Sequence, residues 1–355
     1  MKNSSVNSIR GNHGCVIMAS GLGVRFGGNK LMAEFNGMPM IQHILDITDN
    51  LFKIRVVVTR NSEVKALCEA QNIPVIFHEF PYRSDTIRLG LKSIKSDIDG
   101  CMFCLADQPL LTRKTIETIL ENTDKDLIVK PVSFGKPGSP VWFSSKYFDE
   151  LLNLPQDLGG NYVAKKHSDS IKFVEINNEY EFQDMDTRAL KDFYEQLTIQ
   201  LGSFLESGKR HIVITGNRGS GKTTLFNNLM ADKLPGLTSW VVRGEAVYIK
   251  ENSQDEKHII GLYDDSLVGK INMRISPDGF TSFAIPALDK LINSETSWIS
   301  IDEIGFLETG CPLYIEKLEE AFSKKHVIAV VRKQDLPFLN AIKSREDVYL
   351  IDKSI

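Results

Sequence analysis

Short apolar stretches alternate with segments of helical periodicity along the first half of the chain. Ile54–Thr59 reads IRVVVT, a β-branched run typical of a buried strand, and residues 15–18 and 101–105 are similar apolar runs. Between such runs, apolar residues recur three and four positions apart; Ser62, for example, is expected to cap a helix that continues to Ala70. This order predicts βα units around a mostly parallel sheet, whose ligands bind at the carboxyl ends of the strands.

The second half continues this pattern after a predicted linking helix. Residues 192–207 place Phe193, Leu197, Leu201 and Phe204 at helical spacing and predict one continuous helix. The fold class is therefore α/β, with two three-layer domains. Three further strands are expected at residues 211–215, 298–301 and 327–331, and the predicted division is a disordered lead-in at residues 1–12, a first domain at 13–199 and a second domain at 200–355.

The composition is ordinary for a globular protein and argues against some classes of function. The chain has 355 residues and a formal net charge of −4, which speaks against a nucleic-acid binder that works by bulk electrostatics. No apolar run approaches the roughly 18 residues that span a bilayer. Residues 1–14 are polar and lack the apolar core of a signal peptide. We therefore expect a cytoplasmic protein with neither a membrane nor a nucleic acid as partner.

The cysteines agree with this compartment. There are five, an odd number, and free thiols in a reducing cytoplasm are the simplest interpretation. Cys101 and Cys104 form a C-x-x-C, but they lie inside a predicted strand, where alternation points them to opposite faces. A buried-strand role is favoured over a metal or redox role.

A loop with little side-chain bulk follows the first predicted strand. Such a loop can bring backbone N–H groups against a polyphosphate, while arginine and lysine neutralise its charge. A plain turn with two solvated cations explains the same residues equally well by spacing alone. The residues in question are Ala19, Ser20, Gly21, Gly23, Arg25 and Lys30.

Several carboxylates are candidate ligands for a metal ion near this loop. Asp107 follows the predicted strand at residues 101–105, and Mg²⁺ favours one or two carboxylates plus substrate phosphates. Asp184 and Asp186 share a face if their segment is extended, and one of them could complete the site. The alternatives are that Asp107 is a loop or capping residue and that Asp186 or Thr187 caps the next helix. The loops at residues 135–140 and 157–161 are either the acceptor side of a cleft or ordinary connections.

Taken together, the ordered motifs of residues 13–195 resemble the molybdenum cofactor cytidylyltransferase group of the MobA-like nucleotidyltransferases. The resemblance implies a Rossmann-like domain that transfers a nucleotidyl group from an NTP to a molybdopterin-type phosphate and releases pyrophosphate. It assigns the triphosphate to the glycine loop, Ser84, Arg25 and Lys30, and Mg²⁺ to Asp107 and Asp186. The matching segments are Ala19–Gly27, Lys30-Leu31, Gly37-Met38-Pro39 with His43, Ser84–Leu91, Ala106–Pro109, Gly138–Val141, Asp157–Gly160 and Asp184–Thr187.

Some positions depart from that pattern. Ser20, a small residue other than glycine, resembles the CTP-using members more than the GTP-using ones. Ala106 replaces a glycine, Ser139 stands where members that handle the cofactor often have histidine, and Arg188 replaces a proline. These changes leave the triphosphate apparatus intact and concern the second substrate.

The second half contains a complete G-x-x-x-x-G-K-T motif between a predicted strand and a helix, the context of a P-loop. In this motif the backbone cradles phosphates, Lys222 reaches the terminal ones and Thr223 binds Mg²⁺. Asp302 fits the carboxylate beside Mg²⁺, and Glu303 fits the group that orients or deprotonates water. The remaining phosphate-binding candidates are Gly216, Gly219, Ser220, Gly221 and Thr224.

This half resembles the small P-loop nucleoside-triphosphatases of the THEP type, through Ile301–Gly305, Glu308, Leu336–Phe338 and Arg345. Arg332 is a candidate charge stabiliser. The resemblance implies NTP hydrolysis, with either ATP or GTP, that could drive handover of the cofactor to a molybdenum hydroxylase client. The rival hypothesis is a maturation chaperone, whose first domain binds cofactor or nucleotide without transferase activity.

Overall fold

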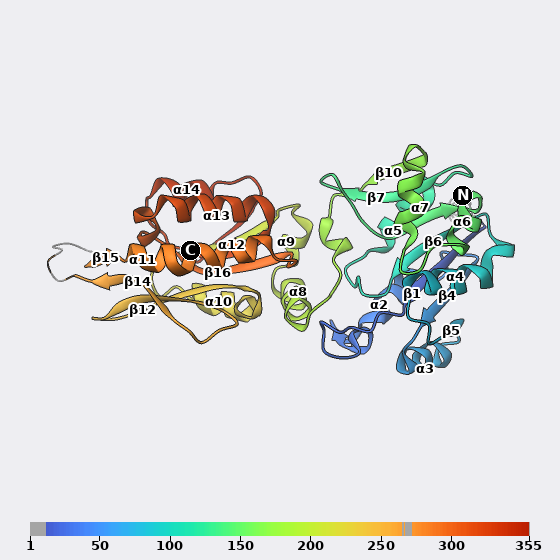
Figure 1. Cartoon of the computed structure of the whole chain (residues 1–355), viewed down its shortest axis with the longest axis horizontal. Coiled ribbons are helices and arrows are strands. Elements are labelled where there is room, and N and C mark those ends of the chain that lie inside the picture. The colour runs from blue at the N-terminus through green and yellow to red at the C-terminus, as the bar shows by residue number, and fades with distance from the viewer. Residues whose placement is uncertain (1–11, 265, 267–271, 355) are drawn as a thin grey trace. The chain divides into compact units, whose positions relative to one another are not determined.

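A computed structural model describes residues 12–264, 266 and 272–354 (Figure 1). The chain divides into two compact units, Met1–Lys191 and Asp192–Ile355. This division falls inside helix α8 (Arg188–Gln200), somewhat before the predicted boundary at residue 199, because the aromatic residues of α8 pack on a strand of the second unit. The predicted lead-in lies outside the described residues except for Asn12.

The first unit is built on a mostly parallel sheet of eight strands. Strand β9 is the antiparallel member of the main path, paired with β6 and β7, and β8 adds a short antiparallel edge to β7. The expected parallel βα arrangement is confirmed. In spatial order the strands are β10 (Ile171–Glu175), β7 (Ile128–Ser133), β9 (Val141–Ser144), β6 (Gly100–Leu105), β1 (His13–Ala19), β4 (Ile54–Thr59) and β5 (Val75–Phe77), with β8 (Lys136–Pro137) beside β7.

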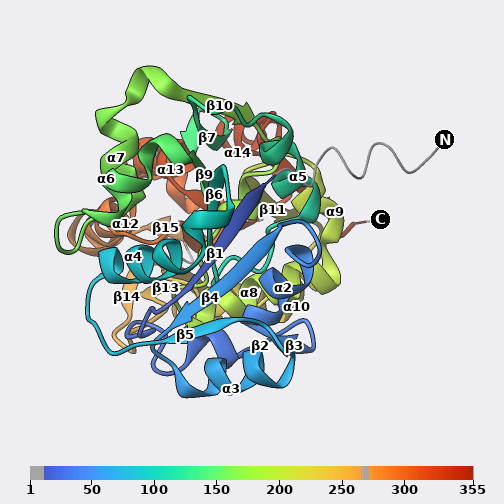
Figure 2. The same ribbon diagram turned by 90° about the vertical axis from the view of Figure 1, so that its right-hand side faces the viewer.

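Helices cover both faces of this sheet, as Figure 2 shows. Side chains that alternate along β6 serve the two layers: Cys104 belongs to one core and Cys101 to the other. Both thiols are fully buried, which supports the buried-strand interpretation. One layer contains α2 (Met40–Ile47), α3 (Ser62–Ala70) and α5 (Arg113–Glu121), and the other contains α4 (Arg83–Ile94), α6 (Phe148–Leu152) and α7 (Gly160–Lys166).

Of two local predictions, the tight turn at Asn36-Gly37 is confirmed and the cap at Ser62 is wrong. Asn36 and Gly37 form the tight turn of a small hairpin between β2 (Glu34–Phe35) and β3 (Met38–Pro39), with φ of 49° and 83° as such turns require. The cap of α3 is Asn61 and not Ser62: its side chain accepts hydrogen bonds from the backbone N–H groups of the first turn. Asparagine is as good a cap as serine, and here it precedes the helix by one residue.

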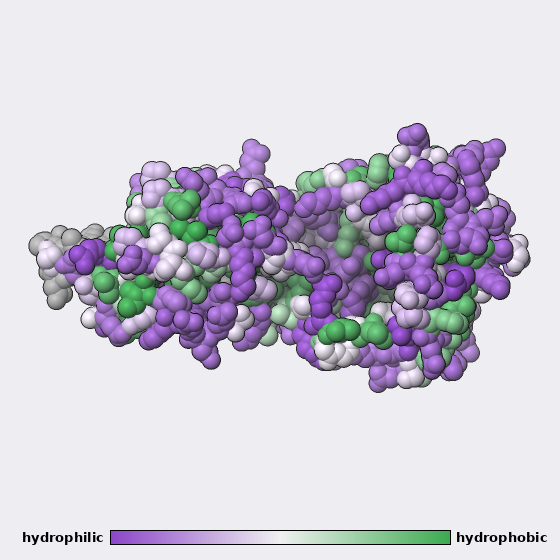
Figure 3. Space-filling model, viewed as in Figure 1, coloured by the Kyte–Doolittle hydropathy of each residue, from purple (hydrophilic) through white to green (hydrophobic). Residues whose placement is uncertain are grey.

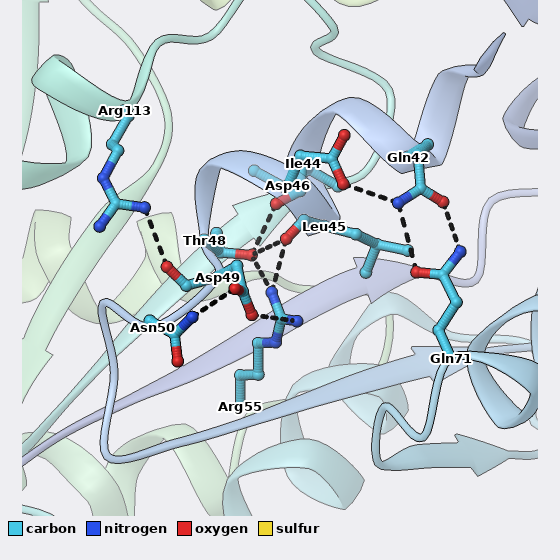
Figure 4. A network of polar contacts seen from close by, with 10 residues as sticks. All are labelled: Gln42, Ile44, Leu45, Asp46, Thr48, Asp49, Asn50, Arg55, Gln71 and Arg113. Carbon is cyan, nitrogen blue, oxygen red and sulfur yellow. Dashed lines mark hydrogen bonds and ion pairs between the residues drawn. The ribbon is translucent and has the colours of Figure 1, made fainter.

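A network of polar contacts closes the carboxyl end of α2 (Figure 4). The Arg55 guanidinium donates to the carbonyl of Leu45 at 2.5 Å, to the hydroxyl of Thr48 at 3.1 Å and to Asp49 at 3.0 Å. Arg113 donates to the carbonyl of Asp49 at 2.9 Å. The carbonyls that a helix leaves unpaired at its end are thus satisfied by a strand side chain.

The second unit has its own eight-stranded sheet. Its five-stranded core, from β12 to β18, is parallel, and β13, β14 and β15 extend it as an antiparallel meander. In spatial order the strands are β15 (Met273–Ile275), β14 (His258–Tyr263), β13 (Ala246–Glu251), β12 (Gly236–Val242), β16 (Trp298–Ile304), β17 (His326–Val331), β11 (His211–Thr215) and β18 (Val348–Asp352).

Helices again lie on both faces. One face carries a short helix, α11 (Pro277–Gly279), and then α12 (Ile285–Asn293), α13 (Pro312–Lys324) and α14 (Pro337–Lys343). The other face carries α10 (Lys222–Asn228) and the segments that contain Phe193 and Phe204, whose rings contact Trp298. The prediction of one continuous helix at residues 192–207 is wrong. The helix breaks at Leu201, with φ of −137° and ψ of 42°, and restarts as α9 (Gly202–Glu206). The break lets Phe193 and Phe204 both pack on Trp298, whose indole N–H donates to the Tyr194 hydroxyl at 2.9 Å.

Within the described part of the chain, no helix combines the length and apolar character needed to cross a bilayer. The face of the molecule in Figure 3 is mainly hydrophilic, with small and scattered apolar areas.

Candidate functional sites

The glycine loop after β1 folds into a tight turn. The N–H groups of Phe26 and Gly27 both donate to the carbonyl of Gly23 at 3.0 Å. Gly23 has a φ of +60°, and a Cβ there would lie 2.5 Å from the carbonyl oxygen of Gly28, so a larger residue is excluded. The loop is therefore compact, and no side chain can be accommodated at Gly23.

Contacts on both sides hold the start of the loop. The Ala19 carbonyl accepts from Thr59 Oγ1 at 3.0 Å, and Ser20 Oγ donates to the Val58 carbonyl at 3.1 Å. Ser20 Oγ also lies 2.9 Å from Nε2 of His78, a buried residue whose pKa is lowered by burial and by Arg60. The role of His78 was missed by the sequence reasoning, because nothing in its local pattern marks it.

Lys30 brings two predicted site residues together. It sits in a short turn after the loop, its side chain is only 9% exposed, and Nζ donates to Asp107 and, at 3.0 Å, to Asp186. Arg25 Nη1 lies 3.7 Å from Asp186. Burial alone would lower the pKa of Lys30, but the charges of Asp107 and Asp186 and the hydrogen bonds to them outweigh it and raise the pKa. Lys30 is therefore a charged group between two carboxylates.

A third carboxylate, Asp184, lies behind this pair. Gln108 Nε2 donates to its Oδ1 at 2.8 Å and to the Phe182 carbonyl at 3.0 Å. Burial, followed by the charge of Asp107, raises the pKa of Asp184 to about 6. Asp184 is thus held by Gln108, and Asp186 is the one that meets Lys30. Thr187 Oγ1 accepts from the Leu190 N–H at 3.2 Å, so the capping alternative holds for Thr187 at the same time.

The donor set fits a magnesium ion. Asp107 and Asp186 both reach one ammonium group, so their oxygens are close enough to share a cation. Two carboxylates with open positions suit Mg²⁺, which keeps waters and takes phosphate oxygens as ligands. Among the described residues, no cluster of three His, Cys, Asp or Glu side chains forms a closed metal cage.

The two predicted acceptor loops pack closely against side chains of other segments. At Gly138 a Cβ would lie 2.5 Å from the Phe182 ring. The Ser139-Pro140 peptide bond of the same loop is cis. Gly159 lies against Arg83 of α4. Two residues later, Asn161 accepts a hydrogen bond at 2.8 Å from Lys130, a lysine on β7 that is 9% exposed and that sequence reasoning did not single out.

The second unit carries the P-loop in the expected place, between β11 and α10. Gly216, Gly219 and Gly221 have φ of +143°, +77° and +83°, conformations that favour glycine. Lys222 Nζ donates to the carbonyls of Gly216 and Asn217 at 3.1 and 2.9 Å. The loop thus curls around its own lysine, as it would around a phosphate group.

The acidic pair of β16 lies beside the P-loop. Both residues are inside the strand and not after it, and the ladder shifts register between Ile301 and Ile304 to accommodate them. Asp302 is 7% exposed and its Oδ1 has no hydrogen-bond partner; burial and the charge of Glu303 raise its pKa to about 7. Glu303 has φ of +82° and pairs with Arg332. The orphaned oxygen of Asp302 is what a Mg²⁺ ligand needs.

These groups surround a cavity of about 1100 Å³. Its lining includes Thr223 and Thr224 as well as Lys222, Asp302 and Glu303, so the predicted residues of this half are brought to one place. Ser220 Oγ is buried without a hydrogen-bond partner next to them.

Comparison with known proteins follows the two units. A family model described as "MobA-like NTP transferase domain" matches residues 15–171, and one described as "NTPase" matches residues 211–354. A "Probable molybdenum cofactor guanylyltransferase" from Aquifex aeolicus is 29% identical over 139 residues, which cover 39% of this chain. This chain spans 65% of that relative's length.

The second half matches more of its relatives. "Nucleoside-triphosphatase THEP1" from a Thermotoga species is 31% identical over 150 residues, covering 40% of this chain and 84% of that protein. The crystal structure of THEP1 from Aquifex aeolicus is 25% identical, covers 41% of this chain and 90% of that one, and gives a TM-score of 0.35. The chain therefore joins a MobA-like NTP transferase domain to a nucleoside-triphosphatase domain that belongs to the THEP1 family.

Proposed function

We propose that this protein is a bifunctional maturation factor for a molybdopterin-type cofactor. The first domain transfers a nucleotidyl group from an NTP to the phosphate of the cofactor and releases pyrophosphate, and the second hydrolyses NTP. The observation that carries the proposal is the position of Lys30, whose ammonium group lies between Asp107 and Asp186 next to the glycine loop. Cation, carboxylates and cradle are the parts that nucleotidyl transfer requires.

The chain itself supplies binding and charge. Backbone amides of the glycine loop other than those of Phe26 and Gly27, which already donate to Gly23, hold the triphosphate. Ser84, in the first turn of α4, is the further residue proposed to bind it. Lys30 and Arg25 stabilise the negative charge that grows on the α-phosphate as an oxygen of the acceptor phosphate attacks it. The bond from the α-phosphorus to pyrophosphate breaks, and no protein nucleophile is needed because the attacking oxygen is already anionic.

Magnesium is the proposed cofactor of both sites. Asp107 and Asp186 would hold it in the first domain, and Thr223 and Asp302 in the second, where it neutralises phosphate charge. In the second domain Lys222 binds the terminal phosphates, and Glu303 orients the attacking water once a bound phosphate draws Arg332 away.

The donor at the first site is proposed to be CTP. Ser20 stands at the small, non-glycine position that supports this, and its hydroxyl is already engaged with Val58 and His78. The curated relatives of this domain are named guanylyltransferases, which makes GTP the competing donor. ATP and GTP are equal candidates at the second site, and a molybdenum hydroxylase is the proposed client.

A screen of NTPs against molybdopterin-type acceptors tests the proposal, with pyrophosphate and phosphate measured separately. We expect pyrophosphate release with one NTP only when acceptor is present. Lys30→Met should reduce it at least about 100-fold, since removing one such donor typically costs that much. Lys53→Met is the matched control, because Lys53 is an exposed lysine directly before β4, at the amino end of that strand. This variant should release pyrophosphate at the wild-type rate.

The rival hypothesis, a nucleotide-driven chaperone, has a different outcome in the same screen. It requires acceptor binding and phosphate release without pyrophosphate release from any NTP. That result would rule out the transferase and leave the second domain as the motor of cofactor handover.

A further inference from the structure

One wall of the cavity around the P-loop is formed by β12 and β13 and not by the loop itself. Thr238 and Trp240 lie on the same face of β12, because side chains alternate along a strand. Their cross-strand partners on β13 are Lys250 and Tyr248. Thr238, Trp240 and Lys250 line the cavity. These four residues, called the β12–β13 wall below, present an aromatic ring and a cation to whatever the cavity holds.

The indole ring of Trp240 is held in place by a neighbouring ring. It stacks on Tyr248 with ring centroids 5.8 Å apart and planes 24° apart. Tyr248 is buried, and Lys257 Nζ lies 4.1 Å from its ring centroid. Trp240 is only partly buried, whereas Trp142 and Trp298 are 2% and 0% exposed. A fixed aromatic ring that borders a cavity is a surface on which another flat ring can stack.

Cations accompany the ring. Arg243, at the turn between β12 and β13, lines the cavity and makes no ion pair within the described ranges of the chain. Lys250 has a loose pair with Asp255, at 3.9 Å, whose carboxylate is fully exposed. Exposed pairs of this kind contribute little free energy, so an anionic ligand can compete for both cations.

Strand register places the wall beyond the terminal phosphate. Thr238 is the Cα partner of Asp302, and Trp240 lies two residues further toward the carboxyl end, roughly 7 Å along the strand. Strand β12 borders β16 on the side away from β11, which leads into the P-loop. Because the P-loop lysine and the acidic strand end face the terminal phosphates, a bound triphosphate ends at Asp302 and the wall lies past that end.

The cavity has room for more than the triphosphate. Its volume of about 1100 Å³ lies at the upper end of the roughly 300–1,000 Å³ typical of ligand sites, and the lining extends from the P-loop to Trp240 and Arg243.

We propose that the β12–β13 wall binds a second ligand, a heteroaromatic compound with an anionic group, of which a nucleoside monophosphate is the simplest example. Its ring stacks on Trp240 and its anionic group pairs with Arg243 and Lys250. The NTPase domain thus holds two ligands side by side, and the second one lies next to the phosphate that is cleaved.

Trp240 itself reports the binding in the full-length protein. The P-loop is first filled with Mg²⁺ and inorganic tripolyphosphate, which has no base, and AMP, GMP or CMP is then titrated. We expect saturable quenching of tryptophan fluorescence that disappears in Trp240→Phe, because the other two tryptophans are buried. Quenching of undiminished size in that variant would come from Trp142 or Trp298 and would contradict stacking on Trp240.

A second arm separates the two sources of a heteroaromatic ring. A non-hydrolysable ATP analogue replaces tripolyphosphate, and the monophosphate is added to the saturated complex. Further quenching supports a separate second ligand. If the analogue alone produces the full quench and the monophosphate adds nothing, the wall holds the base of the triphosphate and the proposal is overturned, as it is if no nucleotide quenches Trp240.

The anionic part of the ligand is tested with charge-neutral variants. Arg243→Gln should raise the Kd for AMP about tenfold and leave that for adenosine within about twofold, since a charge-assisted hydrogen bond is lost only for AMP. Lys324→Gln, an exposed lysine at the end of α13, is the control and should alter neither value. Equal weakening of AMP and adenosine would contradict the proposed pairing.

Discussion

At the scale of single residues, the glycine loop depends on one close approach. Gly23 combines a positive φ with the carbonyl oxygen of Gly28 where a Cβ would be. Gly27 has a positive φ of +75° but open space around it, and Gly21 has neither constraint. The three glycines therefore separate the effects of strain, collision and mere substitution.

Gly23→Ala should abolish pyrophosphate release by the first domain, because the loop must open to admit the methyl group. Gly27→Ala should cost about 1 kcal/mol of stability through backbone strain and reduce the rate modestly. Gly21→Ala should be close to wild type. Kinetics of the three purified variants check the order, and similar rates for Gly23→Ala and Gly21→Ala would contradict it.

A second residue, Glu308, carries a pH effect. It is 5% exposed, its Oε2 accepts a hydrogen bond from the Gly305 N–H at 2.9 Å, and Tyr314, Arg332 and Glu303 are the ionisable groups near it. Burial raises the pKa of this carboxyl to about 7, although the backbone amides and Arg332 act in the opposite direction. Between pH 4.5 and 7 the folded state thus keeps a proton that the unfolded state has released.

The unfolding free energy of the second unit should therefore fall as the pH rises through that window, by about 3 kcal/mol from Glu308. Glu308→Gln mimics the protonated form and should match wild type at pH 4.5 but be more stable by about that amount at pH 8. Urea unfolding at several pH values measures the difference in unfolding free energy between Glu308→Gln and wild type. Both proteins contain Asp302, so its similar contribution cancels in that difference. Parallel curves for the two proteins would show that Glu308 is ionised throughout.

At the scale of elements, the end of α2 depends on a side chain from a neighbouring strand. Arg55 is 17% exposed and satisfies a helix carbonyl, a buried hydroxyl and a carboxylate at once (Figure 4). Arg113 touches the same turn through one backbone carbonyl and is 45% exposed. The two arginines form a natural comparison between a structural and a peripheral contact.

Arg55→Met should lower the stability of the first unit by about 1–3 kcal/mol, because buried acceptors lose their donor. Arg113→Met should change it by less than about 0.5 kcal/mol, as surface pairs generally do. The urea midpoint of the first unit gives both values. Equal effects would mean that the helix end is held by its own packing and not by Arg55.

At the scale of the whole molecule, each compact unit has its own sheet and its own glycine-rich loop. Lys222→Ala should abolish phosphate release by the second domain and leave pyrophosphate release by the first unchanged. Lys30→Met should do the reverse. If either variant lost both activities, the two reactions would share one site or depend on each other's ligand.

Much of this organisation could be predicted from sequence. The bounds of β4 and β11 coincide with the predicted runs, and the P-loop lies between a strand and a helix as its motif requires. Local patterns sufficed there because strand burial and glycine conformation act within a few residues. The prediction of a single helix at residues 192–207 failed because tertiary contacts with Trp298 outweigh helical spacing at Leu201.

The sequence by itself determined the class of fold, the two glycine-rich loops and the families that they indicate, since these depend on residues close together in the chain. Only the tertiary structure decided which groups meet. Lys30 joins Asp107 and Asp186 from 77 and 156 positions away, and Arg332 holds Glu303. Strand order, which no local pattern encodes, places Thr238 opposite Asp302, two residues before Trp240. The glycine loops could be predicted from the sequence, because each is a local motif. The charged side chains near them come from distant parts of the chain, and the order of the strands in each sheet brings them together.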